Sequence, residues 1–79
     1  MNYSAYIVRD PKICGGQPVM KGTRVTLRTV LASLAQGSSI GELLENFPTL
    51  TEAHVRAAIA FAAASAQEDL PVPGLPQAI

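Results

Sequence analysis

Apolar residues between positions 26 and 48 recur with a helical period in two successive stretches. The first stretch places them at i, i+3, i+4, i+7 and i+8: Leu27, Val30, Leu31, Leu34 and Ala35. This spacing predicts an amphipathic helix, because residues three and four apart share one helix face. Thr26 is suited to cap its start, with Val25 and Val30 at the staple positions. Gly37 can end the helix in the left-handed conformation.

The second stretch predicts a shorter helix with the same period: Ile40, Leu43, Leu44 and Phe47. Ser39 and Glu42 have the spacing of a capping box at its start. Pro48 ends it, because proline lacks the amide hydrogen that a continuing helix needs.

A third, alanine-rich helix is predicted to begin near Thr51. Leu50 and Val55 stand at its staple positions, although Thr49 with Glu52 offers a competing capping box. We expect this core face: Val55, Ala58, Ile59, Ala62 and Ala66. A second face, predicted to bind a partner or a second copy in a homodimer, comprises Ala53, Ala57, Ala60, Phe61 and Ala64. The alternative is that alanine is present only as the best helix former.

The N-terminal 25 residues are predicted to form short strands and turns. The run at 6–8 is aromatic and β-branched, and Asp10-Pro11 ends it. The extended pieces 18–20 and 24–26 flank Lys21-Gly22-Thr23. This arrangement predicts a small hairpin with glycine at the bend.

These elements predict an α+β fold that is mostly α. A short N-terminal β-ribbon precedes a three-helix, helix-turn-helix-like (winged-helix-like) unit in residues 1–66, and residues 67–79 form an extended tail. Three prolines in the tail oppose a continuing helix. Its apolar residues are predicted to dock on a protein partner, with a frayed chain end as the alternative: Leu70, Val72 and Leu75.

Charge is segregated along the chain, although the net charge of the 79 residues is zero. Residues 1–28 carry five basic residues against Asp10, a net charge of +4, and the remainder carries −4. Such a polarised chain favours an acidic partner for its N-terminal part, although an uneven solvated surface gives the same count. The single cysteine, the lack of an apolar leader and the absence of a long apolar run predict a cytoplasmic protein without membrane contact.

Catalytic chemistry has little support in the sequence. A cysteine nucleophile needs a base, and His54 is the only histidine, far along the chain from Cys14. One cysteine and one histidine also fall short of a zinc ligand set. The glycines at 15, 16 and 22 lack phosphate-loop spacing. We therefore expect no enzyme activity, no metal and no cofactor.

The sequence also offers residues for nucleic-acid binding. A short helix, a tight turn and a longer helix give the outline of a helix-turn-helix, with Thr51, His54 and Arg56 at the start of the third helix. That helix has one arginine and no lysine, so phosphate contacts would need further basic residues: Lys12, Lys21, Arg24 and Arg28. In Gly22-Thr23-Arg24, glycine permits the turn, threonine can bond a neighbouring amide and arginine presents a donor fork. The alternative for Arg24 is an internal ion pair with Glu42 or Glu45.

Three motifs in the first 25 residues are more distinctive than the patterns described above: Asp10-Pro11, Gly15-Gly16-Gln17-Pro18 and Gly22-Thr23-Arg24. With Leu34-Ala35-Gln36-Gly37 and Phe47-Pro48-Thr49-Leu50-Thr51, they resemble a family of small bacterial and archaeal proteins that is catalogued as a domain of unknown function and described as antitoxin-like. The resemblance covers residues 7 to about 64. Ala53 and His54 depart from it, since acidic residues are common after the turn threonine.

The resemblance implies a β-ribbon with a helix-turn-helix-like unit, and a role in toxin–antitoxin pairs whose toxin has a PIN-like nuclease fold. Two interpretations stay open. One is an antitoxin-like protein that binds its toxin and its own operator DNA. The other is a protein-interaction module without DNA binding.

Overall fold

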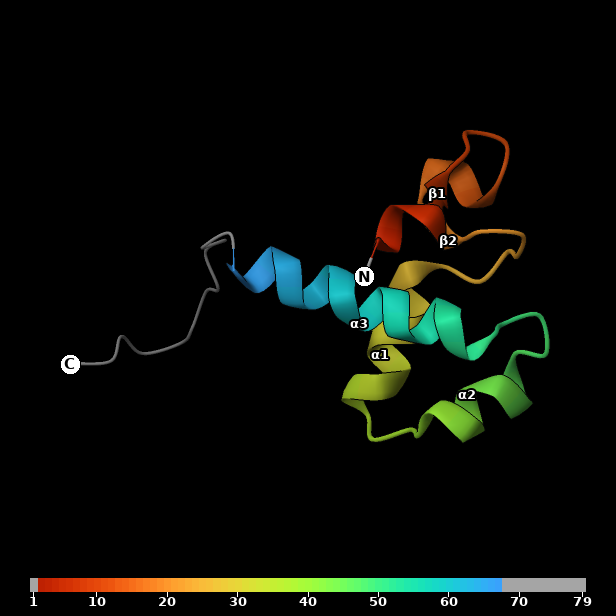
Figure 1. Ribbon diagram of the computed structural model, residues 1–79. Coiled ribbons are helices and arrows are strands. Elements are labelled where there is room, and N and C mark those ends of the chain that lie inside the picture. Colours follow the sequence, from red (N-terminus) through yellow and green to blue (C-terminus); the bar gives the residue numbers. More distant parts are fainter. Residues whose placement is uncertain (1, 68–79) are drawn as a thin grey trace.

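The computed structural model describes residues 2–67 and contains a two-stranded antiparallel sheet followed by three helices (Figure 1). The order is η1 (Tyr3–Ala5), β1 (Ile7–Arg9), η2 (Cys14–Gly16), β2 (Pro18–Met20), α1 (Leu27–Ala35), α2 (Ile40–Asn46) and α3 (Glu52–Gln67). The predicted α+β, mostly α class is confirmed. The tail residues Leu70, Val72 and Leu75 lie outside the described residues.

The β-ribbon pairs different segments from those the sequence predicted. β1 pairs with β2 so that Val8 lies opposite Val19. The expected hairpin between 18–20 and 24–26 is reduced to a single bridge between Val19 and Thr26. The chain leaves extended geometry directly after that bridge, because Thr26 caps α1.

Local caps fix both ends of α1 and the start of α2 as predicted. The Thr26 hydroxyl accepts the Thr29 amide hydrogen at 3.1 Å. Gly37, with φ of 97°, ends α1 in a Schellman motif, since the Ser38 amide bonds the Ser33 carbonyl at 3.0 Å. At the start of α2, the Ser39 and Glu42 side chains form the reciprocal bonds of a capping box.

The cap of α3 uses a histidine where a capping box ordinarily has glutamate or glutamine. The Thr51 hydroxyl accepts the His54 amide hydrogen at 3.3 Å, and His54 Nδ1 accepts the Thr51 amide hydrogen at 3.0 Å. The competing start at Thr49 is not used, because α3 begins at Glu52.

The core lies where β2 and the three helices meet. Its buried members are Met20, Leu27, Val30, Leu43, Leu50, Val55 and Ala58. Figure 1 shows α3 between two groups of elements, with α1 and α2 on one side and the ribbon with η1 on the other. α3 is therefore packed along two sides.

This packing confirms Val55 and Ala58 of the predicted core face of α3 and corrects the rest. Ile59 is 44% exposed, and Ala62 and Ala66 are exposed as well. His54 and Ala57 are buried instead. The reason is that η1 and β1 cover the adjacent face, where the Tyr3 and Phe61 rings meet edge to face at 5.5 Å between centroids.

Candidate nucleic-acid and partner interface

Five basic side chains lie on the N-terminal elements, and all are exposed. One stands in β1, one in the loop after it, two around the turn after β2 and one in the first turn of α1: Arg9, Lys12, Lys21, Arg24 and Arg28. We call these five residues the basic segment. Within residues 2–67 the one ion pair is Arg56–Glu52, so the basic segment has no ion pair there.

The turn that carries Lys21 and Arg24 is fixed by the intervening threonine, as predicted. Gly22 has φ of 80°, a conformation that costs other residues about 1–2 kcal/mol. The buried Thr23 hydroxyl donates to the Met20 carbonyl at 2.8 Å and accepts the Val25 amide hydrogen at 3.0 Å. Lys21 and Arg24 are thus held on a defined backbone.

The alternative of an internal ion pair between Arg24 and Glu42 or Glu45 is wrong for the described residues. The Glu42 carboxylate accepts the Ser39 amide hydrogen at 3.2 Å in the α2 cap instead. The Arg24 guanidinium therefore stays exposed to solvent.

His54 is buried and holds the Lys21 turn against α3. Since Nδ1 accepts the Thr51 amide hydrogen, the ring proton lies on Nε2, which donates to the Lys21 carbonyl at 2.8 Å. Both ring nitrogens are engaged, and the residue is 9% exposed. The ring that was predicted to contact DNA is therefore engaged with backbone groups of its own chain.

The other two predicted readers at the start of α3 also have partners within the helix. Thr51 is exposed, and its hydroxyl accepts the His54 amide hydrogen. The Arg56 guanidinium bonds one Glu52 carboxylate oxygen through two nitrogens, at 2.7 and 2.9 Å. Such an exposed pair stabilises by at most about 1 kcal/mol, so Arg56 is held only weakly.

The predicted small-residue face of α3 is not a free surface along its length. Ala57 is fully buried, and Phe61 packs on Tyr3 and the core. Ala53, Ala60 and Ala64 are half-buried. The exposed face of α3 comprises Ile59, Ala62, Ala63 and Ala66 instead. The sequence pattern missed it because alanine occupies both faces.

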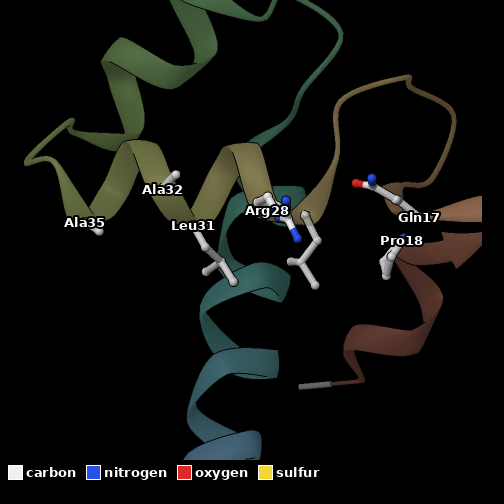
Figure 2. A pocket seen from close by; sticks show the side chains of 7 residues that line it. Gln17, Pro18, Arg28, Leu31, Ala32 and Ala35 are labelled. Atoms are coloured by element: carbon white, nitrogen blue, oxygen red, sulfur yellow. The ribbon is translucent and has the colours of Figure 1, made fainter. Parts of the chain in front are cut away.

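Two open grooves, each of about 630 Å³, were not predicted. The first lies between the start of β2 and α1, and Figure 2 shows its side chains. It is lined by Gln17, Pro18, Leu27, Arg28, Leu31, Ala32 and Ala35. The second lies beside the Gly22 turn and includes Arg24, Val8, Ile13 and Thr49 among its lining residues.

Groups that could hold a metal ion are not gathered in the described part of the chain. No cluster of three or more histidine, cysteine or acidic side chains occurs among residues 2–67. The exposed Cys14 thiol donates to the Arg24 carbonyl at 3.3 Å, and His54 is engaged elsewhere. None of the described helices has the length and apolar character to cross a membrane.

Comparison with known proteins gives consistent matches. The family described as "Protein of unknown function (DUF433)" matches residues 7–62. The uncharacterized protein y4eO of Sinorhizobium fredii is 41% identical over 59 residues, which are 75% of this chain and 27% of that protein. The chain thus spans about a quarter of that relative's length.

A solved structure agrees with the fold. The crystal structure of a DUF433 member protein from Anabaena variabilis superposes with a TM-score of 0.69 at 33% identity, over 80% of this chain and 62% of that one. The family match covers the β-ribbon, α1, α2 and most of α3. The chain belongs to the DUF433 family of proteins of unknown function.

Proposed function

We propose that this protein is a cytoplasmic, antitoxin-like member of a toxin–antitoxin pair, which neutralises a toxin of PIN-like nuclease fold and binds its own operator DNA. The observation that carries the proposal is the basic segment, whose five exposed side chains form no ion pair within residues 2–67. Unpaired arginine and lysine side chains are suited to phosphate groups, because binding releases the counterions of the nucleic acid. The toxin partner follows from the resemblance to antitoxin-like proteins.

The arrangement of the basic segment and the start of α3 favours contacts to the DNA backbone over contacts to the bases. The residues 47–51 join α2 to α3 in a helix-turn-helix outline. However, the His54 ring and the Thr51 hydroxyl serve the α3 cap. Affinity would therefore come mainly from phosphate contacts, which vary strongly with salt. A homodimer would double their number.

Binding, and not catalysis, is the proposed mode of action. A cysteine nucleophile needs an adjacent base. Here the Cys14 thiol bonds a backbone carbonyl, and His54 uses both ring nitrogens to hold backbone groups. Neither residue is arranged for proton transfer to the other.

The second candidate function is a protein-interaction module without DNA affinity. Its support is the internal engagement of His54 and Arg56 at the start of α3, together with the apolar groove on α1. A DNA-binding measurement separates the two candidates.

The DNA test compares the loss of positive charge in the basic segment with its loss at the start of α3. Replacing Lys21 and Arg28 by alanine should weaken binding to the protein's own promoter and reduce the salt slope by about two units, one for each lost phosphate contact. Arg56→Ala is the positional control, which removes one charge that is paired with Glu52, and we expect it to leave the slope within about half a unit of the original. Binding that is equally strong at low and high salt would overturn the DNA part of the proposal.

The toxin test uses the product of the adjacent reading frame. Expression of that product alone should arrest growth, and co-expression of this protein should restore it through a complex that co-purifies. If the neighbour encodes no growth-arresting protein, or if arrest persists despite a stable, folded partner chain, the antitoxin assignment fails.

A further inference from the structure

The groove on α1 combines an apolar floor with hydrogen-bond donors at its edge. Figure 2 shows Leu31, Ala32 and Ala35 along α1, with Gln17 and Pro18 across from them. Arg28 lies between the two sides, and its guanidinium has no ion pair within residues 2–67. A ligand that fits this groove is apolar and rich in hydrogen-bond acceptors, which pair with these donors. It is also poor in donors of its own, because a donor that is buried without an acceptor costs about 1–3 kcal/mol.

The last 12 residues of the sequence have this composition. Residues 68–79 contain four large apolar side chains, two carboxylates and no lysine or arginine. Three of them are prolines, which offer a carbonyl acceptor but no amide donor. The net charge of residues 68–79 is −2, opposite in sign to the net charge of +4 on residues 1–28. The segment and the groove are therefore complementary in polarity, donors and charge.

The segment is also long enough to return to the groove from the end of α3. α3 has 16 residues and is about 24 Å long. An extended chain of 12 residues spans about 40 Å. Since α3 packs against α1, a chain that leaves Gln67 can run back along α3 and still cover the groove.

We propose that residues 68–79 bind the α1 groove of their own chain. Leu70 and Val72 then cover Leu31, Ala32 and Ala35, and the side chains of Arg28 and Gln17 donate to backbone carbonyls of the proline-rich segment. The prolines restrict the free segment, so less conformational entropy is lost on binding. Attachment to the same chain supplies a millimolar-range effective concentration, which makes a weak contact sufficient.

The test is nuclear magnetic resonance on the full chain. Methyl cross-peaks should connect Leu70 and Val72 with Leu31, Ala32 or Ala35. The variant Ala32→Glu places a charge in the groove and should abolish these cross-peaks. Ala63→Glu is the matched control, an exposed alanine on α3 that does not line the groove, and should retain them.

A second variant keeps the proposal testable if Ala32→Glu fails to fold. Replacing Leu70 and Val72 by serine changes no residue of the core and should shift the amide signals of Ala32 and Ala35. Unchanged signals would overturn the proposal. Cross-peaks found only between chains, in a mixture of labelled and unlabelled protein, would assign the groove to the tail of a second copy and overturn binding within one chain.

Discussion

The Nε2 atom of His54 donates a hydrogen bond to the backbone carbonyl of Lys21 at 2.8 Å, across 33 residues of sequence. The same ring accepts the Thr51 amide hydrogen through Nδ1, so one side chain caps α3 and fastens the turn that carries the basic residues. The family resemblance leads one to expect an acidic residue just after the turn threonine. Here histidine completes the cap of α3 and adds the link to Lys21.

Two replacements of His54 should lower the free energy of unfolding by different amounts. His54→Ala removes both hydrogen bonds of the ring, including the part-buried bond to the Lys21 carbonyl, so we expect a loss of about 2–4 kcal/mol in the free energy of unfolding. His54→Gln can still accept the Thr51 amide hydrogen, as glutamine does in a capping box, and should cost about 1 kcal/mol less than alanine. Urea denaturation measures both. Equal losses for the two variants would show that the side-chain hydrogen bond to the Thr51 amide contributes nothing to stability.

Two glycines should respond in opposite directions to alanine. Gly22→Ala forces a side chain into a backbone with φ of 80°, although a Cβ there meets no atom within 4 Å. We expect a loss of about 1–2 kcal/mol from backbone strain alone. Gly41 lies inside α2 without positive φ, and its Cβ would lie 3.8 Å from the Ser39 hydroxyl oxygen. Gly41→Ala should therefore stabilise by about 0.5–1 kcal/mol. Thermal unfolding of the two variants measures these opposite changes in stability. A Gly22→Ala variant that is more stable than the original protein would contradict the turn geometry.

The Tyr3 and Phe61 rings should be energetically coupled. Their edge-to-face contact joins η1 to α3, and such pairs contribute about 0.5–1.5 kcal/mol beyond the area that they bury. A double-mutant cycle with Tyr3→Ala and Phe61→Ala isolates this coupling. A coupling energy near zero would show that η1 is not held against α3 in solution.

We expect a homodimer that uses the exposed face of α3. Ile59 is the one large apolar side chain that is exposed in residues 2–67, and it lies beside exposed alanines. Light scattering at micromolar concentration should give twice the mass of 8.3 kDa. Ile59→Glu should return a folded monomer, whereas Ala57→Glu should unfold the chain because Ala57 is fully buried. A monomer at all concentrations, or a dimer unaffected by Ile59→Glu, would exclude this interface.

The three helices and most of their ends were predictable from the sequence because their causes are local. The caps at Thr26, Gly37 and Ser39 involve groups within five residues of one another. The Gly22-Thr23-Arg24 turn is equally local, since the threonine bonds residues two and three positions away. Patterns of this range are present in the order of residues alone.

The tertiary structure alone decided which side of α3 is buried and which groups are free to bind. Alanine occupies several faces of α3, so periodicity did not separate Ala57, which is buried, from Ala62, which is exposed. The choice follows from η1 and β1, which pack on α3 from more than 40 residues away. The same long-range packing placed His54 on the Lys21 carbonyl and formed the groove between Pro18 and α1. These contacts depend on how separate elements meet, which a single sequence does not specify position by position.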